Sequence, residues 1–418
     1  MTTGLTSMIP EPQSAGPRKR ILILVHRVPY PPDKGDRIRS YHLVAHLARL
    51  GEVDLAFLTD EPVEAETLEV LGRLCRRVEA VPVSRFGRWI RAAWSLANGR
   101  SLTEGLFESP TLRTLIGRWL GEADYDAVVC YSSGVLSYVL GRGLESRLVA
   151  DLVDVDSQKW FDYAGRASGP KAALFRLEGR RVRTLEREAG RARAVVLATN
   201  TEAEIYRNFC PDACVEAVSN GVDLDYFQPV LGVEETGGCV FAGQLDYRAN
   251  VLGLEWFCRE VWPLIRERVP SATFDIVGRK PVAAVQRLSA VPGIRVVGPV
   301  PDVRPYLQAA RIVVVPLPVA RGVQNKVLEA MAMGRAVAAS PAALEGLALV
   351  PGRDALAIDE PDDWSRTIAR LWDDTQTRTE LGRSARRYVE QNHRWETCLG
   401  RFDDLIDGKV GRLLGSQG

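Results

Sequence analysis

Residues 312–334 read IVVVPLPVARGVQNKVLEAMAMG, and this stretch decides the fold. It opens with the β-branched run 312–315, passes through a proline-rich turn, and then spaces its apolar residues along one face of a helix. A short apolar strand followed directly by a helix is the repeating unit of a parallel sheet covered by helices. The spacing predicts a helix that begins near Gly322 and carries Lys326 and Glu329 on its polar edge.

The same alternation of short apolar runs and helical patterns extends over most of the chain. The predicted strands are 21–25, 53–58, 78–83, 127–130, 147–151, 194–198, 214–218, 239–242, 273–277, 294–297, 312–315, 336–339 and 355–358. The pattern is that of an α/β protein with two doubly wound, Rossmann-like domains. Ligands of such sheets bind outside the carboxyl ends of the strands, so we expect a site in a cleft between two facing domains.

One segment interrupts the alternation and marks the expected domain boundary. Asn220-Gly221, Pro229 and the run GVEETGG follow each other without a helical or strand period. The predicted boundaries are a disordered tail over 1–19, the first domain over 20–218, a linker over 219–238, the second domain over 239–390, and a C-terminal helix and tail over 391–418.

Composition and charge exclude several classes of protein. The 418 residues are 46% hydrophobic and 26% charged with a formal net charge of +1, so no global field favours nucleic acid as a partner. The seven cysteines are scattered without a C-x-x-C pair, which is typical of reduced thiols in a cytoplasmic protein. No apolar stretch approaches the ~20 residues of a membrane span. We therefore expect a cytoplasmic protein without a metal or other cofactor.

The segment around Gly322 has the chemistry of a phosphate site. A helix that begins at a glycine after a strand end offers unpaired backbone amides and the positive end of its dipole. Arg321 and Lys326 would add charge-assisted contacts, and Glu329, one turn further, could accept hydrogen bonds from a ribose. The alternative is an ordinary amphipathic helix whose Lys326 and Glu329 form an exposed ion pair.

Two segments of the first domain also follow predicted strands. In PPDKGDR, residues 31–37, Gly35 permits a turn close to a ligand, and the alternative is a Pro/Gly turn with solvated charges. In DLVDVDSQKW, Asp154 and Asp156 lie just beyond a strand end, where carboxylates can bind sugar hydroxyls; a structural capping role for Asp156 is the alternative. His26, at the tip of the first predicted strand, could line the same edge.

A basic stripe lies within residues 171–193. Its arginines recur at helical spacing and are Arg176, Arg180, Arg183, Arg187 and Arg191. Such a helix could rest on anionic lipid at the inner face of the membrane, or it could present a solvated arginine face while its apolar side packs in the core.

Four motifs in chain order resemble glycosyltransferase family 4, which has the GT-B fold. They are SNGVDLDYF at 219–227, FAGQLDYRANVLGLEWF at 241–257, GPVPDVRPYL at 298–307 and RGVQNKVLEAMAMGRAVAAS at 321–340. Within that family the chain is similar to the group associated with exosortase (PEP-CTERM) loci and exopolysaccharide synthesis. The resemblance covers about 20–395 and implies two Rossmann-like domains, with C-terminal helices that cross back to the first.

The resemblance implies the activity and its partners. It implies a retaining transferase that moves a sugar from a nucleoside diphosphate to a glycan or polyprenyl-linked acceptor, needs no metal, and works in exopolysaccharide biosynthesis. Two other classes stay open. One is a sugar-nucleotide epimerase of similar fold, and the other is a non-catalytic nucleotide-sugar-binding scaffold.

Carried over position by position, the resemblance assigns the expected site. The catalytic residues are Lys326, Arg321 and Asp154; the donor-binding residues are Glu329, Gly322, Val323, Asn325, Gly243, Arg248, Pro301 and Gly35; the acceptor-side residues are Asp156, Arg37 and His26. The chain departs from the family pattern at two positions. Arg321 stands where the first glutamate of the E-x7-E motif is expected, and Gln244 stands where many relatives have an arginine that binds the diphosphate.

Overall fold

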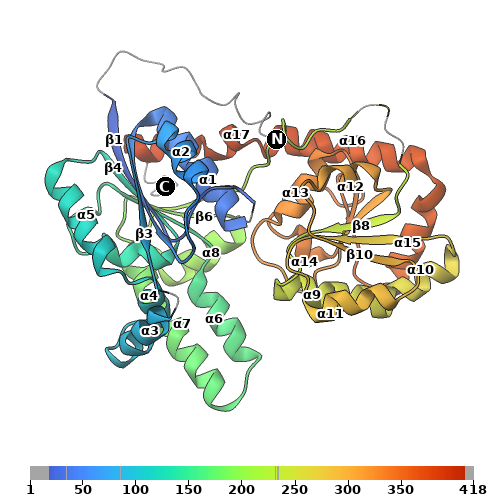
Figure 1. Cartoon of the computed structure of the whole chain (residues 1–418), viewed down its shortest axis with the longest axis horizontal. Coiled ribbons are helices and arrows are strands. Elements are labelled where there is room, and N and C mark those ends of the chain that lie inside the picture. The colour runs from blue at the N-terminus through green and yellow to red at the C-terminus, as the bar shows by residue number, and fades with distance from the viewer. Residues whose placement is uncertain (1–17, 34, 85, 231, 233–234, 410–418) are drawn as a thin grey trace, which may run out of the picture. The chain divides into compact units, whose positions relative to one another are not determined.

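The chain folds into two compact units. The computed structural model describes residues 18–33, 35–84, 86–230, 232 and 235–409 (Figure 1). The first unit consists of Met1–Ser219 and Leu399–Gly418, and the second unit is Asn220–Cys398. Most of the predicted tail over 1–19 lies outside the described residues, and the first strand begins at Lys19. The segment 220–238 is part of the second unit, with Val222 and Leu224 in its core.

The first unit is built on a seven-stranded parallel sheet. Its strand order is β3-β2-β1-β4-β5-β6-β7. The strands are β1 (Lys19–Val25), β2 (Gly51–Thr59), β3 (Arg77–Pro82), β4 (Ala127–Tyr131), β5 (Leu148–Val153), β6 (Ala194–Leu197) and β7 (Val215–Ala217). The order reverses direction between β1 and β4, so the crevice for a ligand is expected at the carboxyl ends of these two strands.

Helices cover both faces of this sheet. They are α1 (Gly35–Leu50), α2 (Ala65–Leu74), α3 (Gly87–Ala97), α4 (Leu102–Phe107), α5 (Pro110–Glu122), α6 (Asp156–Gly165), α7 (Gly169–Ala189) and α8 (Asn200–Phe209), with a 3-10 turn at Ser133–Tyr138. Residues of α5, α7 and α8 share one hydrophobic cluster with alternate residues of the central strands. The opposite face packs against α1, whose Leu43, Val44 and Leu47 are fully buried.

The C-terminal end of the chain belongs to the first unit. Helix α18 (Arg401–Asp407) is held there by Arg193, whose Nη1 donates to the carbonyl oxygens of Leu405 and Ile406 at 3.0 and 3.1 Å. His46 of α1 lies 2.7 Å from Asp403. The chain thus returns to its first unit after completing the second.

The second unit is built on a six-stranded parallel sheet with the order β10-β9-β8-β11-β12-β13. The strands are β8 (Cys239–Ala242), β9 (Phe274–Val277), β10 (Ile294–Gly298), β11 (Ile312–Val315), β12 (Ala336–Ala339) and β13 (Leu356–Ala357). Here the order reverses between β8 and β11, which places the expected crevice at the carboxyl ends of those strands.

The helices of the second unit bury both faces of its sheet. They are α9 (Arg248–Trp256), a π-helical turn (Phe257–Val261), α10 (Trp262–Arg268), α11 (Ala283–Gln286), a 3-10 turn (Arg287–Ala290), α12 (Arg304–Ala309), α13 (Asn325–Ala332), α14 (Pro341–Leu344), α15 (Pro361–Asp373), α16 (Thr375–Asn392) and α17 (Trp395–Leu399). Val313 and Val315 belong to one hydrophobic cluster, while Ile312 and Val314 belong to another. The two-residue period of a strand therefore divides β11 between two cores.

One fully buried ion pair lies inside the first unit. Arg39 of α1 and Asp151 of β5 are both 0% exposed. Arg39 Nε lies 3.0 Å from Asp151 Oδ2, and its Nη1 donates to the carbonyl oxygen of Val218 at 2.8 Å. Burial raises the pKa of Asp151, and the Arg39 guanidinium opposes that rise. The pair ties α1 to the centre of the sheet and to the end of β7.

We predict that Asp151→Asn lowers the free energy of unfolding by about 3–5 kcal/mol, because it leaves the Arg39 charge buried without its counterion. Arg39→Met combined with Asp151→Leu should recover most of that loss. Urea denaturation of the wild type, the single variant and the double variant measures the loss. Glu69→Gln, which removes an exposed i,i+4 pair with Arg73, is the control and should cost no more than about 0.5 kcal/mol. Equal losses in the single and double variants would contradict the buried-pair account.

Candidate functional site

The expected phosphate segment lies at the reversal point of the second sheet, but its helix starts later than the sequence predicts. Helix α13 begins at Asn325 with Gln324 as its N-cap. The prediction of a helix start near Gly322 is wrong because that glycine has φ +65°, in the left-handed region that a right-handed helix excludes. Gly322 and Val323 therefore lie in the loop between β11 and α13. Val323 is buried and packs in the core of the second unit.

Lys326 makes hydrogen bonds to two side chains and lies over an aromatic ring. Its Nζ donates to Asn250 Oδ1 at 3.0 Å and to Gln324 Oε1 at 3.4 Å. The same nitrogen lies 5.8 Å from the ring centroid of Phe241, the third residue of β8. Both hydrogen-bond acceptors are neutral amides. Among the described residues, no carboxylate lies within ion-pair distance of Lys326, so its positive charge is oriented but not neutralised.

Glu329 lies one turn along α13 from Lys326. Its side chain is half-buried, and within the described residues its carboxylate has no hydrogen-bond or ion-pair partner. The exposed Lys326–Glu329 ion pair that the sequence left open is therefore absent from the described part of the chain. A carboxylate desolvated without a protein partner retains its full capacity to accept hydrogen bonds from a ligand.

The electrostatic environment of the two side chains follows from their burial. Desolvation lowers the pKa of Lys326 to about 8, and the Glu329 carboxylate opposes this shift. Desolvation raises the pKa of Glu329 to about 7, against the effect of Lys326. Both shifts favour the neutral forms, so binding a polyanion beside Lys326 and hydroxyl groups beside Glu329 would stabilise the charged forms.

Close backbone packing brings β8 next to Lys326. A Cβ added to Gly243, which follows β8, would lie 3.1 Å from Lys326 Cε and 3.3 Å from Asn250 Nδ2. Asn250 is 2% exposed, and its Nδ2 donates to the carbonyl oxygen of Gln244 at 2.7 Å. Glycine at position 243 thus leaves room for the lysine to reach across the strand end.

The structure places the other predicted donor-side residues as follows. Arg321 is half-buried in the loop before α13, and its carbonyl oxygen accepts a hydrogen bond from Gln324 at 3.0 Å. Asn325 Oδ1 accepts from Asn220 Nδ2 at 3.0 Å, so this side chain already joins α13 to the start of the second unit. Arg248, the first residue of α9, and Pro301 are exposed, and no described contact joins either of them to Lys326 or Glu329.

The residues around Lys326 that sequence reasoning missed are Asn250 and Gln324. Asn250 lies within the motif 241–257, but only the fold brings it to a lysine 76 positions away. Gln324 directly precedes α13, where its amide can reach both Arg321 and Lys326. An amide side chain in the first turn of the helix that follows β8 was the available signal for Asn250.

In the first unit, the predicted carboxylates share one lysine. Lys159 Nζ lies 2.9 Å from Asp154 Oδ2 and 3.1 Å from Asp156 Oδ1. Burial alone would lower the pKa of Lys159, but the two carboxylates raise it well above its ordinary value. Asp154 Oδ1 is buried without a hydrogen-bond partner among the described residues. Val153, just before it, has φ +68°, a strained conformation for a β-branched residue.

Asp156 is not the N-cap of α6, because the helix starts at Asp156 and its N-cap is Val155. Ser133, after β4, donates to Asp156 Oδ2 at 2.5 Å. The amide of Ser157, the second residue of α6, donates instead to Glu186 at 3.0 Å. The capping alternative for Asp156 is therefore wrong, and its carboxylate stays on the strand-end side.

His26 follows β1 and completes this edge of the first sheet. Its ring stacks on Tyr131 at 5.8 Å and meets Phe107 edge-on at 5.4 Å between centroids. Burial and the neighbouring Arg27 lower the pKa of His26 to about 4, so the ring is neutral at pH 7. Its Nδ1 is buried without a hydrogen-bond partner within the described residues. Asp156 is close enough to oppose this pKa shift.

Gly35 and Arg37 stand at the start of α1. Gly35 is exposed and is the first residue of the helix. Arg37 lies 3.6 Å from Asp33 and 3.7 Å from Glu61, so its charge is shared with two carboxylates.

The described residues contain no group of three or more histidine, cysteine, aspartate or glutamate side chains able to hold a metal ion. Likewise, no helix of the described chain is long and apolar enough to cross a membrane.

Comparison with known proteins identifies what this architecture resembles. Residues 237–374 match the family model described as "Glycosyl transferases group 1". No curated protein matches the chain. Among solved structures, sucrose-phosphate synthase from Thermosynechococcus elongatus is 17% identical, with a TM-score of 0.67 over 93% of this chain and 98% of that one.

Two further structures have the same fold. HepE of Anabaena, solved with UDP and glucose, is 15% identical with a TM-score of 0.63, covering 93% of this chain and 99% of its own. WaaG, a glycosyltransferase involved in lipopolysaccharide biosynthesis, is 15% identical with a TM-score of 0.61, covering 93% of this chain and 100% of its own. The predicted GT-B fold is thus confirmed, and the match to the group 1 glycosyltransferase model lies within the second unit.

The raised pKa of Glu329 predicts how stability depends on pH. Because the folded state holds the Glu329 proton up to about pH 7, its stabilising contribution is present below the unfolded pKa of about 4.3 and is lost as pH rises through 7. Glu329→Gln should remove this part of the slope, worth up to about 4 kcal/mol before any screening by solvent. Urea denaturation between these pH values measures the difference.

Glu345→Gln, a change at an exposed glutamate of the same unit, is the matched control and should leave the pH profile as it is in the wild type. If Glu329→Gln also has the wild-type profile, Glu329 is not desolvated and the site as described is incorrect.

Proposed function

We propose that this protein is a retaining glycosyltransferase that moves a sugar from a nucleoside diphosphate to a glycan or lipid-linked acceptor. One observation carries the proposal. Within the group 1 domain, the half-buried Lys326 and Glu329 lie beside the reversal point of the sheet with their charges uncompensated by ion pairs in the described chain. That edge is where doubly wound sheets bind nucleotides.

The donor half of the proposal follows from charge. The β-phosphate of the donor becomes the leaving group when the bond from the anomeric carbon to its oxygen breaks, and negative charge then accumulates on the diphosphate. Lys326 is held by two neutral amides, so it can stabilise that charge without losing an ion pair first. Glu329 would accept hydrogen bonds from the ribose hydroxyls, which favours its ionised form. HepE was solved with UDP, so a UDP-sugar is the first donor to test.

The acceptor half rests on the first unit. Asp154 offers a buried carboxylate oxygen without a described partner, and the neutral His26 offers an unpaired ring nitrogen. Such groups can orient sugar hydroxyls, while the acceptor proton passes to the departing phosphate as the new glycosidic bond forms. We assign Asp154 to orientation of the sugar or acceptor, with Asp156, Arg37 and His26 as acceptor-side residues and Gly35 near the donor. No metal ion is required in this scheme.

The finer affiliation is also part of the proposal. The motifs at 219–227, 241–257, 298–307 and 321–340 support family 4 and the exosortase-associated group, and hence a role in exopolysaccharide biosynthesis. Arg321 at the position of the expected first glutamate would place an additional cation beside the donor.

Transfer can be tested by incubating the protein with UDP-, GDP- and dTDP-sugars, with and without membrane lipid extract, while nucleotide release and sugar identity are followed. We expect acceptor-dependent nucleotide release and a product that keeps the donor's anomeric configuration. Asp154→Asn should slow transfer by about 10- to 100-fold, the cost of one hydrogen bond to a charged group, with little change in donor affinity. Asp124→Asn, which alters a fully exposed carboxylate, is the matched control.

Three results would contradict the proposal. Conversion of the donor sugar without acceptor would indicate an epimerase. Donor binding without turnover in the presence of acceptor would indicate a scaffold. Unchanged transfer in Asp154→Asn would remove Asp154 from the acceptor side.

A further inference from the structure

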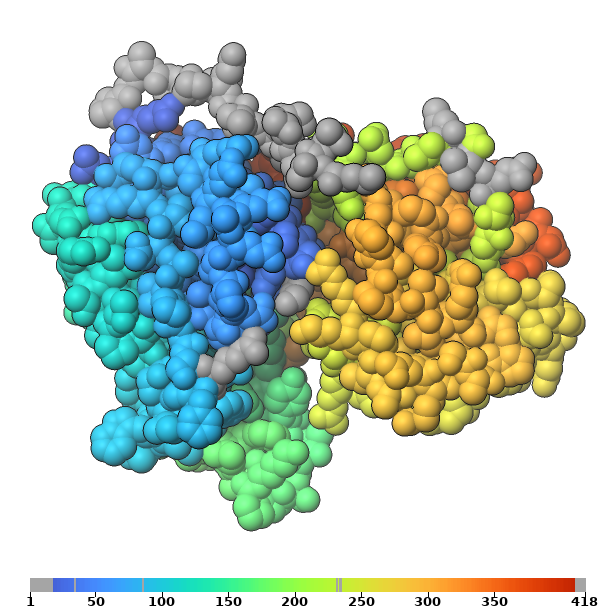
Figure 2. Space-filling model, in the orientation of Figure 1, coloured from blue at the N-terminus to red at the C-terminus, as the bar shows by residue number. Residues whose placement is uncertain are grey.

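Helix α3 presents an apolar face to solvent. Its exposed large side chains are Phe86 at the N-cap, Trp89, Ile90 and Trp94, with exposed fractions of 80%, 61%, 61% and 72%. They follow the i, i+3, i+4, i+8 spacing of a single helix face. In a water-soluble domain such a face normally turns inward, so its exposure calls for a partner. Figure 2 shows α3 in light blue at the lower edge of the first unit.

The opposite side of α3 explains why the apolar face cannot turn inward. Ala92 and Ser95 are buried against α4, and a Cβ added to Gly105 of α4 would lie only 2.6 Å from Ala92 Cα. Ser95 Oγ donates to the carbonyl oxygen of Ser101 at 2.9 Å. Only small side chains fit this contact, so the rotation of α3 about its axis is fixed with its large side chains outward.

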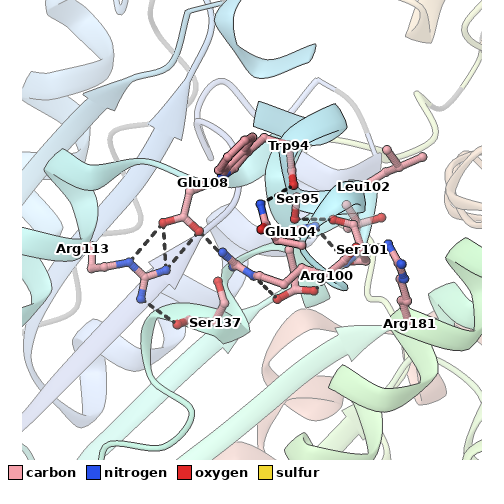
Figure 3. A network of polar contacts seen from close by, with 12 residues as sticks. Trp94, Ser95, Arg100, Ser101, Leu102, Glu104, Glu108, Arg113, Ser137 and Arg181 are labelled. Carbon is pink, nitrogen blue, oxygen red and sulfur yellow. Dashed lines mark hydrogen bonds and ion pairs between the residues drawn. The ribbon is translucent and has the colours of Figure 1, made fainter. Parts of the chain in front are cut away.

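A polar network holds α3 and α4 in this orientation (Figure 3). Ser101 and Glu104 form a capping box at the start of α4. Arg100 bonds Glu104 at 3.1 Å and Glu108 at 3.0 Å. From α7, Arg181 Nη1 donates to the carbonyl oxygens of Leu96 and Arg100 at 2.6 and 2.7 Å. The apolar face of α3 is therefore attached rigidly to α7, which lies beside it at the lower end of the first unit (Figure 1).

The surface charge of α3 and α7 is mostly positive. Residues 84–100 contain no acidic residue. The acidic residues of α7 are Glu178 and Glu186, which are both 0% exposed, and Glu188, which is exposed in the last turn of the helix. Glu178 accepts hydrogen bonds from the backbone amides of Leu102 and Thr103, so its carboxylate caps the start of α4. The exposed cations between 163 and 187 are Arg166, Lys171, Arg176, Arg180 and Arg187.

We propose that α3 is a membrane-docking helix that inserts Phe86, Trp89, Ile90 and Trp94 into the interface of an anionic lipid bilayer. The exposed arginines of α7 would contact the lipid headgroups. Tryptophan prefers the boundary between headgroups and acyl chains, and each nearby cation strengthens binding to an anionic surface. This assigns lipid contact to α3 and α7 together, whereas the sequence suggested only the basic stripe.

Charge is the reason to favour lipid over a second copy of the chain. Two copies meeting through this face would bring two cationic surfaces together, and like charges at an interface oppose association. An anionic bilayer neutralises them and also accepts the aromatic side chains. The inference does not depend on the proposed transfer reaction, because docking requires neither donor nor acceptor.

Flotation of the full chain with lipid vesicles tests the proposal. We expect binding to vesicles of phosphatidylglycerol and phosphatidylcholine, and much weaker binding to phosphatidylcholine alone. Trp89→Ser combined with Trp94→Ser should weaken binding at least about tenfold through lost apolar insertion. Arg176→Glu combined with Arg180→Glu should weaken it about tenfold or more and reduce its sensitivity to salt.

Matched variants separate docking from general effects. Leu68→Ser removes an exposed leucine of α2, and Arg287→Glu with Arg383→Glu reverses two exposed arginines of the second unit. Both controls should bind vesicles as the wild type does. Melting followed by circular dichroism confirms that each variant is folded, and if the tryptophan pair fails to fold, the arginine pair alone decides. Absence of wild-type binding, wild-type binding in both test variants, or a wild-type dimer that Trp89→Ser with Trp94→Ser dissolves would overturn the proposal.

Discussion

The site in the second unit depends on one constraint, which is the cost of holding a lysine and a glutamate in a desolvated position without pairing them. Lys326 is oriented by the amides of Asn250 and Gln324, and Glu329 has no described partner. The pKa of Lys326 is therefore lowered and that of Glu329 is raised, and both shifts favour the neutral forms. A protein that only needed stability would pair or replace these groups. The proposed function accounts for their arrangement beside the reversal point of the sheet, because a diphosphate would compensate the charge of Lys326 and ribose hydroxyls would donate hydrogen bonds to Glu329.

The first unit uses its charges differently. Lys159 is shared by Asp154 and Asp156 within the protein, and the buried pair of Arg39 and Asp151 fastens α1 to the sheet. The groups at the strand ends that have no hydrogen-bond partner among the described residues are Asp154 Oδ1 and His26 Nδ1. Such groups are suited to neutral sugar hydroxyls, whereas the second unit is suited to a diphosphate. The outward face of α3 adds a means of bringing this unit to a lipid surface.

The fold could be predicted from the sequence because β-branched runs such as 312–315 are buried on both faces of parallel sheets and leave a strong local signal. Local pattern did not locate the start of α13, because a glycine is compatible with both a helix start and the left-handed turn found at Gly322. It also could not find Asn250, since its contact with Lys326 is tertiary. Helical periodicity predicts that α3 has an apolar face, but it does not say whether that face is buried. The close contact of α3 with Gly105 of α4 determines which side of α3 points outward.

Calorimetric titration of the protein with UDP across pH tests the central claim most directly. The account predicts that affinity falls as pH rises through about 8, where Lys326 loses its proton in the free protein. Lys326→Met should weaken binding at least about tenfold at neutral pH and lose this pH dependence, while the exposed Lys171→Met should match the wild type. Unchanged affinity and an unchanged pH profile in Lys326→Met would contradict the account.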